Sequence, residues 1–289
     1  MSWSSSGRPD REARRGRRGR AALGGLALAL LAGLLVTGPS AGGARPLVAA
    51  HRGGALLWPE NSLTAFRGAL GLGVDLLELD VHLTRDGEVV VLHDPTLDRT
   101  TTGRGPVRDL TWADFGPVTL KGGVREGVPR LRDVLALVMP TPAGLLVEIK
   151  VGVDGARYPG IEEKVLGLLD EAALRDRTTV MAFEWQSLER LRALAPRIRL
   201  TGLLSRREAD RLGGLGAATA RLVAIGANEV GIERALLSAE AVETARAAGL
   251  GLGVWTVNES DELRQALALG VDYVTTDRPD LALKLRAGE

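Results

Sequence analysis

Histidines and carboxylates gather in one short stretch of this sequence. All three histidines, His51, His82 and His93, fall there, together with Glu78 and Asp80. Histidine titrates near neutral pH, and imidazoles beside carboxylates suit proton transfer around a metal ion. A lone histidine more often only packs or caps a helix, but this grouping favours acid/base chemistry.

Three carboxylates are predicted to meet at one place. Glu78 and Asp80 lie two residues apart on an expected strand and so share a face, as do Glu148 and Lys150 on a later strand. Neighbouring strands of a parallel barrel bring such residues together, and three unpaired anions would repel one another. We therefore expect one divalent cation, Mg²⁺ or Ca²⁺, held by oxygen atoms. The alternative is a carboxylate cluster paired only with Lys150 and Arg52.

The elements that must position these residues follow a regular alternation. Short apolar runs, expected to be strands buried on both faces, cover residues 47–51, 76–81, 145–149, 179–183, 200–204, 222–225, 250–254 and 273–275. Helical patterns lie between them at residues 63–70, 131–138, 161–173, 188–194, 239–247 and 259–269. Residues 45–289 have about the length of one (β/α)8 barrel. We predict an α/β fold, a single-domain TIM barrel.

One further apolar run, residues 89–92, breaks the alternation. It follows the second strand after only Thr84-Arg85-Asp86-Gly87, and so short a turn cannot return the chain for a parallel pairing. We expect a hairpin-like excursion over residues 81–93. It would carry His93 and Asp94 back over the mouth of the barrel, where barrel enzymes do their chemistry.

The N-terminus has the layout of an export signal. Seven arginines lie in the first twenty residues, before the uncharged apolar residues 21–36. That run is shorter than the roughly 20 residues needed to span a bilayer, and small residues follow it, which favours cleavage. Residues 1–44 are therefore expected to be a signal peptide or, alternatively, a retained membrane anchor. The protein is predicted to be secreted or extracytoplasmic, by an export route that the paired arginines do not decide.

Composition removes several function classes. The chain has no cysteine, which excludes disulfides, thiolate metal sites and cysteine nucleophiles, so any metal must be held by oxygen or imidazole. The net charge is +1 and aromatic residues make up 3% of the chain, which gives no support to nucleic-acid binding. No oligomeric state is predicted.

An ordered set of motifs resembles the glycerophosphodiester phosphodiesterase family, from about residue 47 to the C-terminus. Individually the motifs are weak, but their order is specific. They are His51-Arg52-Gly53, Pro59-Glu60-Asn61-Ser62, Glu78-Leu79-Asp80-Val81, Thr84-Arg85-Asp86-Gly87, His93-Asp94, Glu148-Ile149-Lys150, Trp255-Thr256-Val257-Asn258 and Thr276-Asp277-Arg278-Pro279. The loop that follows His93, with Leu97-Asp98-Arg99-Thr100-Thr101, also resembles that family.

The resemblance implies a reaction and a set of roles. His51 and His93 would be the acid/base pair, and the divalent ion would bind Glu78, Asp80 and Glu148. A phosphodiester needs positive charge on its phosphoryl oxygens, a base and an acid, and Arg52 and Lys150 would add to the positive charge. The substrate would be a small glycerophosphodiester, cleaved to sn-glycerol 3-phosphate and an alcohol. Which histidine is the base, and whether water or a glycerol hydroxyl attacks first, stay open.

Other residues have both a structural and a functional interpretation. Glu60 could contact substrate, although it and Asn61 precede a helix that Asn61 or Ser62 would cap. Trp255 could form an apolar wall beside the substrate, or only pack.

For three more residues, His82, Asp94 and Lys150, a functional role is conceivable but we expect a simpler one. His82 shares the face of the carboxylates, but we expect it to make hydrogen bonds rather than bind the metal. Asp94 could do no more than shape the turn before Pro95. A barrel Lys150 could form an imine, yet a carboxylate and a cation nearby would keep it protonated.

Two other functions remain as alternatives. A lysophospholipase D or sphingomyelinase D-like enzyme would need an apolar approach surface, and residues 96–129 offer few aromatics beyond Trp112 and Phe115. A secreted solute-binding barrel could keep the metal without turnover.

Overall fold

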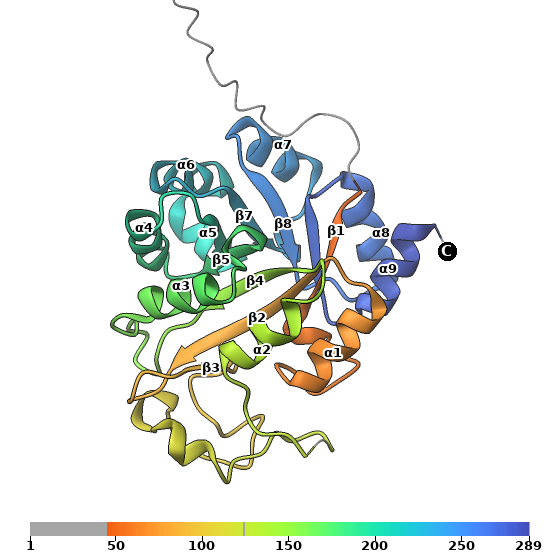
Figure 1. Ribbon diagram of the computed structural model, residues 1–289. Coiled ribbons are helices and arrows are strands. Elements are labelled where there is room, and N and C mark those ends of the chain that lie inside the picture. The colour runs from red at the N-terminus through yellow and green to blue at the C-terminus, as the bar shows by residue number, and fades with distance from the viewer. Residues whose placement is uncertain (1–44, 124, 289) are drawn as a thin grey trace, which may run out of the picture. The chain divides into compact units, whose positions relative to one another are not determined.

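Parallel strands form a closed barrel in the computed structural model, which describes residues 45–123 and 125–288 (Figure 1). Within these residues the barrel order is β1-β2-β4-β5-β6-β7-β8-β9, and β1 closes it by pairing in parallel with both β9 and β2. This is the predicted (β/α)8 TIM barrel. Its strands are β1 (Leu47–Ala50), β2 (Leu76–Leu83), β4 (Gly144–Ile149), β5 (Thr178–Ala182), β6 (Arg199–Leu204), β7 (Glu229–Glu233), β8 (Gly251–Trp255) and β9 (Tyr273–Thr276).

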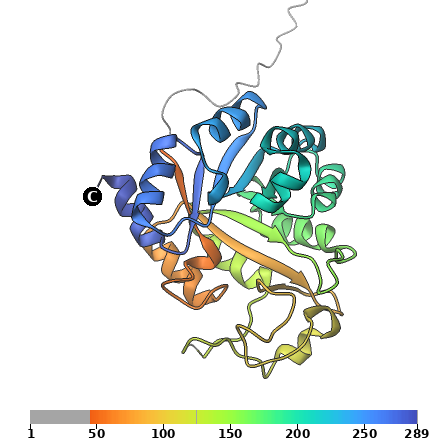
Figure 2. The ribbon, with the colours of Figure 1, turned by 180° about the vertical axis from the view of Figure 1, so that it is seen from behind.

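Helices surround the barrel, as the views from both sides show (Figures 1 and 2). The main apolar core lies between the outward faces of the strands and these helices, and a smaller cluster that includes Leu146, Met181 and Tyr273 fills the interior. The helices are α1 (Leu63–Leu72), α2 (Leu131–Val138), α3 (Ile161–Glu171), α4 (Trp185–Leu194), α5 (Arg206–Leu212), α6 (Leu215–Ile225), α7 (Ala239–Ala247), α8 (Ser260–Leu269) and α9 (Pro279–Ala287).

One predicted strand is wrong. Residues 222–225 form the last turn of α6, which ends at Gly226 with a left-handed φ of 80°. The strand that belongs here is β7, Glu229–Glu233, which carries a glutamate at each end and so lacks a continuous apolar run. The helices α5, α6 and α9 were also not predicted. The other predicted strands and helices overlap elements of the structure.

The segment Leu-Gly-Val-Asp occurs twice, at residues 72–75 and 269–272, and makes the same contacts at both places. Gly73 ends α1 and Gly270 ends α8, with φ of 79° and 69°, which favour glycine. The aspartates that follow accept hydrogen bonds from strand backbones: Asp75 from the Val48 N–H at 2.8 Å and Asp272 from the Leu252 N–H at 2.7 Å. The repeat therefore ties a helix end to a neighbouring strand.

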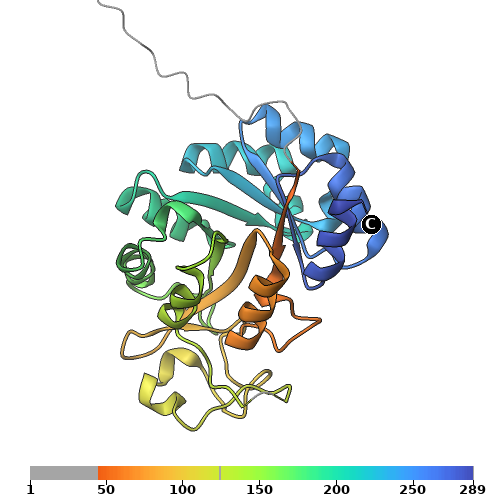
Figure 3. The ribbon, with the colours of Figure 1, turned by 45° about the vertical axis from the view of Figure 1, so that its right-hand side comes forward.

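The predicted hairpin is confirmed. β3 (Val89–Val91) pairs antiparallel with the end of β2, Val81 opposite Val91 and Leu83 opposite Val89. The segment that follows, residues 94–123 and 125–130, forms a lobe beside the barrel, drawn in yellow to yellow-green in Figures 1 and 3. We call this lobe, which follows the hairpin and does not include it, the excursion. It has its own apolar cluster, in which Phe115 is buried with Val90, Leu97 and Val107.

The predicted export segment, residues 1–44, lies outside the described residues. In residues 45–123 and 125–288, no helix combines the length and the apolar character that a membrane crossing requires.

Candidate active site

Three buried carboxylates meet at the carboxyl ends of β2 and β4. The parallel register places Asp80 directly beside Glu148, and Glu78 lies two residues earlier on the same face of β2. One oxygen from each of the three lies within 4.8 Å of the others. The predicted convergence of Glu78, Asp80 and Glu148 is therefore present in the structure.

This carboxylate cluster is suited to a cation. Burial and the nearby charges of Asp80 and Glu148 raise the pKa of Glu78 to about 8, and burial also raises the pKa of Glu148. Asp80 Oδ1 is buried and accepts no hydrogen bond. Mutually repelling carboxylate oxygens, one of them without a hydrogen bond, are the kind of ligands that Mg²⁺ and Ca²⁺ bind in proteins. The cluster could hold a divalent metal ion.

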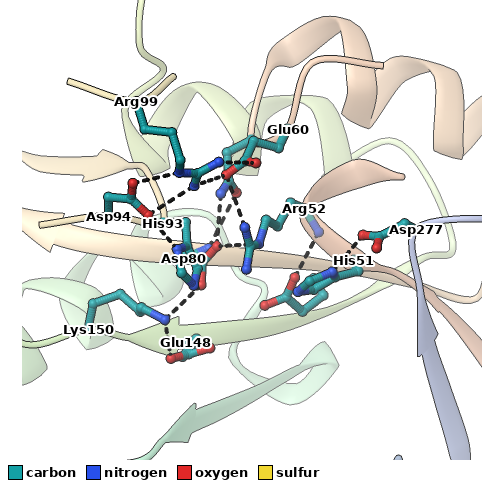
Figure 4. Close-up of polar contacts among 12 residues, drawn as sticks. His51, Arg52, Glu60, Asp80, His93, Asp94, Arg99, Glu148, Lys150 and Asp277 are labelled. Atoms are coloured by element: carbon teal, nitrogen blue, oxygen red, sulfur yellow. Dashed lines mark hydrogen bonds and ion pairs between the residues drawn. The ribbon is translucent and has the colours of Figure 1, made fainter. Parts of the chain in front are cut away.

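Two cationic side chains flank the cluster (Figure 4). Lys150 Nζ lies 2.6 Å from Glu148 Oε1 and 3.4 Å from Asp80 Oδ1, and Arg52 Nε lies 3.5 Å from Asp80 Oδ2. Burial alone would lower the pKa of Lys150, but Glu148 and Asp80 raise it above its ordinary value. Lys150 therefore keeps its proton, which argues against an imine-forming lysine.

His51 and Arg52 reach the site through a tight turn at the end of β1. The backbone N–H of Arg52 donates to Glu78 Oε2 at 2.8 Å. The turn lies directly against α1, because a Cβ on Gly53 would come within 2.7 Å of the Ala65 side chain. Glycine at this position lets the turn lie close enough for Arg52 to bind Glu78.

His51 is held by the carboxylate of Asp277, the residue that directly follows β9. The His51 Nδ1 lies 2.7 Å from Asp277 Oδ1. Asn258 donates to Asp277 Oδ2 at 2.7 Å and accepts from the Asp277 N–H at 2.9 Å. Burial alone would lower the pKa of His51, but Glu78 and Asp277 raise it above its ordinary value. Asp277 thus fixes the orientation of the ring through Nδ1.

His93 is held differently, by its neighbour in sequence. Asp94 Oδ1 lies 2.8 Å from His93 Nδ1, and Arg99 binds both oxygens of Asp94, at 2.6 and 2.9 Å. Asp94 therefore does more than shape the turn. Burial, assisted by Lys150 and Arg52, lowers the pKa of His93 despite the opposing effect of Asp80.

His82 makes hydrogen bonds, as predicted. Its Nδ1 lies 2.8 Å from the Tyr158 hydroxyl and its Nε2 lies 3.1 Å from the backbone oxygen of His93. Burial lowers the pKa of His82 to about 4, so the ring is neutral at physiological pH. It supports the backbone of His93.

A cavity of about 100 Å³ lies at the barrel mouth, with His51 and His93 in its lining on one side and Phe183 and Trp255 on the other. One wall is charged and the other is apolar, with Phe183 edge-on to Trp255 at 5.3 Å between ring centroids. Trp255 Nε1 also donates to the Gly231 oxygen at 2.9 Å, so Trp255 both packs and forms a wall. The cavity is lined by His51, Arg52, Glu78, His93, Glu148, Lys150, Met181, Phe183, Leu203, Trp255, Thr256 and Thr275.

Glu60 lies outside that lining. Its carboxylate accepts from Arg52 Nη1 at 3.1 Å and from Arg99, which places it behind Arg52. Ser62, rather than Asn61, caps α1 by accepting from the Ala65 N–H at 2.9 Å. Asn61 instead donates to Asp80 Oδ2 at 2.8 Å, from a positive φ of 56°.

Sequence reasoning gave no role to Asp277, Asn258 or Arg99. All three stand in or beside the quoted motifs, and that position in a motif is the only signal that could have singled them out. Spacing could not, because Asp277 lies 226 residues from the histidine it holds.

Comparison with known proteins agrees with this geometry. The model of the glycerophosphoryl diester phosphodiesterase family matches residues 51–281, a span that contains His51, His93 and the carboxylate cluster. The chain belongs to this family. It is therefore an enzyme of the phosphoric diester hydrolase class, a glycerophosphodiester phosphodiesterase.

Individual family members are similar over nearly their whole length. A glycerophosphodiester phosphodiesterase of Caldanaerobacter subterraneus subsp. tengcongensis is 34% identical over 248 residues, 83% of this chain and 98% of that one. An Agrobacterium tumefaciens crystal structure assigned as a glycerophosphoryl diester phosphodiesterase aligns with a TM-score of 0.81 and 32% identity, over 85% of this chain and 98% of that one. An Oleispira antarctica phosphodiesterase, solved with the product sn-glycerol-3-phosphate, aligns with a TM-score of 0.74 and 25% identity, over 85% and 98%.

Proposed function

We propose that this phosphodiesterase hydrolyses small glycerophosphodiesters to sn-glycerol 3-phosphate and an alcohol, in a reaction that requires a divalent cation, Mg²⁺ or Ca²⁺. The observation that carries the proposal is the arrangement of two histidines around a cavity whose charged wall is formed by Arg52, Lys150 and the carboxylate cluster. The Oleispira relative, which was solved with sn-glycerol-3-phosphate, supports the choice of product.

The cation would be held by Glu78, Asp80 and Glu148. When bound, it would supply positive charge that stabilises the phosphoryl oxygens in the transition state. Arg52 and Lys150 add to that charge from the protein side. Both are already oriented by Asp80, and both line the cavity. Their contribution is to bind and orient the phosphate anion.

His51 and His93 would move the protons. Each has its Nδ1 held by an aspartate, so each presents Nε2 as the exchanging atom. One histidine removes the proton from the attacking hydroxyl, and the other protonates the departing alkoxide. The apolar wall of Phe183 and Trp255 keeps water away from one side of the cavity.

The test is a coupled assay for glycerol 3-phosphate with purified protein. Glycerophosphocholine, glycerophosphoethanolamine, glycerophosphoglycerol and glycerophosphoinositol are compared with lysophosphatidylcholine and sphingomyelin. We expect release from the soluble diesters, and loss of release in His51→Ala and His93→Ala. Faster cleavage of the lipids would favour the lipid-directed alternative. Binding of glycerophosphodiesters without any product would favour the solute-binding barrel.

We also propose that residues 1–44 direct the barrel out of the cytosol. The arginine-rich start followed by an apolar run and small residues supports this. Fractionation of cells expressing the full chain, with N-terminal sequencing of the product, tests it. Barrel protein found only in the cytosol with its first residues intact would contradict it.

A further inference from the structure

We propose that Arg99, an exposed residue of the excursion, is a positioning residue for His93. The inference rests on the proposed function, in which His93 transfers a proton. The Arg99 guanidinium lies between two carboxylates and binds both as a double fork (Figure 4). It donates to Asp94 at 2.6 and 2.9 Å and to Glu60 twice at 2.8 Å.

The link to His93 runs through Asp94. The oxygen of Asp94 that meets His93 Nδ1, Oδ1, is also bound by Arg99 Nη2. Because Arg99 holds the second oxygen as well, the carboxylate cannot rotate away from the ring. The Asp94 side chain is 24% exposed, so without Arg99 water would compete for the same oxygens. Arg99 and His93 together hold the pKa of Asp94 far below its ordinary value.

The other side of the fork is anchored to the barrel. Glu60 precedes α1 and shares its Oε1 with Arg52 Nη1, at 3.1 Å. Arg99 therefore connects the excursion to the turn that carries His51 and Arg52. Arg99 and Glu60 lie 39 residues apart in sequence.

Arg99 acts only through other residues. Its side chain is 47% exposed and does not line the cavity. Its backbone oxygen accepts from Lys121 Nζ at 3.1 Å, which ties it into the excursion. A lysine at this position would keep the charge, but its single ammonium could not form two planar forks at once.

The first experiment measures kcat and KM for glycerophosphocholine in Arg99→Ala and Arg99→Lys. Arg104→Ala serves as the matched control, because Arg104 is an exposed arginine of the same excursion that is not in this cluster. We expect Arg99→Ala to lower kcat by up to about tenfold, no more than the loss of Asp94 through which it acts, with a smaller change in KM. Arg99→Lys should recover part of the loss, and Arg104→Ala should match wild type.

Two further measurements separate positioning from general stability. Combined with Asp94→Asn, Arg99→Ala should add little to the loss in kcat, because both changes break the same support. Free guanidinium at millimolar concentration should restore part of the activity of Arg99→Ala, and the same concentration of NaCl should not. Multiplicative losses in the double variant, or no rescue, would overturn the inference even if Arg99→Ala is less stable.

The inference and the proposed function fail in different ways. If His93→Ala keeps wild-type activity, the proposed function is wrong. If His93→Ala is inactive while Arg99→Ala behaves like Arg104→Ala, only the role of Arg99 is wrong.

Discussion

The supports of the two histidines come from different parts of the molecule. His51 is held by Asp277, which follows the last barrel strand, and Asp277 is in turn bound by Asn258 from the loop after β8. His93 is held by Asp94 and Arg99 in the excursion, a lobe with an apolar cluster of its own. One histidine is therefore supported by the barrel and the other by an addition to it.

The His–Asp pair in the barrel is also less exposed to solvent than the pair at the excursion. His51 and Asp277 are 17% and 16% exposed, whereas His93 and Asp94 are 32% and 24% exposed. Hydrogen bonds to charged groups contribute more where water is excluded. We therefore expect the loss of Asp277 to lower kcat more than the loss of Asp94, although both histidines are required for the proposed reaction.

The largest expected effect falls on both sides equally. His51→Ala and His93→Ala should each lower kcat by about 10²- to 10⁴-fold, the range for loss of an acid or base. Steady-state kinetics with matching thermal melts check this. A large loss in only one variant would show that a single histidine moves both protons.

The carboxylate cluster serves both sides, and Glu78 tests it. Without metal, the pKa of about 8 means that Glu78 must take up a proton on folding at neutral pH, which costs stability, so the neutral Glu78→Gln should raise the Tm of metal-free protein. The variant should lose the rise in Tm that Mg²⁺ or Ca²⁺ gives the wild type, and should lose roughly a hundredfold or more in activity.

The pH dependence of metal binding has a defined sign. Binding must displace the proton of Glu78, so wild-type affinity should increase with pH until about 8 and then level off. Calorimetric titrations at several pH values measure it. A flat affinity between pH 6 and 8, the two or so pH units below the pKa of Glu78, would contradict the protonation of Glu78.

The next effect separates the two supports. Asp277→Asn should lower kcat by about a hundredfold and Asp94→Asn by about tenfold, the two ends of the usual range for such residues. Removing the Asp277 charge should also lower the pKa of His51, because that charge favours the protonated ring. The pH profile of kcat/KM in the two variants would show it. Equal losses, or a larger loss in Asp94→Asn, would reverse the comparison.

The smallest effect is expected one step further from the ring. Asn258→Ala removes the donor to Asp277 Oδ2 and the acceptor of the Asp277 N–H, and each net hydrogen bond is worth about 1 kcal/mol. Because Asp277 keeps its own hydrogen bond to His51, we expect about half of this energy to reach the barrier, roughly a fivefold loss in kcat. A loss as large as that of Asp277→Asn would mean that Asn258 positions more than Asp277.

The carboxylate cluster was predictable because strand geometry alone brings it together. Glu78 and Asp80 share a face by alternation, and Glu148 follows from the pairing of adjacent parallel strands. β7 was not predictable in the same way. The glutamates at both ends of β7 interrupt the apolar run expected of a buried strand, whereas the apolar end of α6 has the pattern of one.

The supports of the histidines depend on tertiary folding. Asp277 lies 226 residues from His51, and Arg99 meets Glu60 across 39 residues, distances over which no local spacing rule applies. Asp94 was adjacent to His93 in sequence, yet only the fold shows that its carboxylate turns back onto the ring.

The most direct test of the account is release of sn-glycerol 3-phosphate from glycerophosphocholine by EDTA-treated wild-type protein, before and after excess MgCl₂ or CaCl₂ is restored. We expect no release without the cation and recovery once it is present. Release at the same rate in both samples would contradict a role for Glu78, Asp80 and Glu148 in holding a required cation.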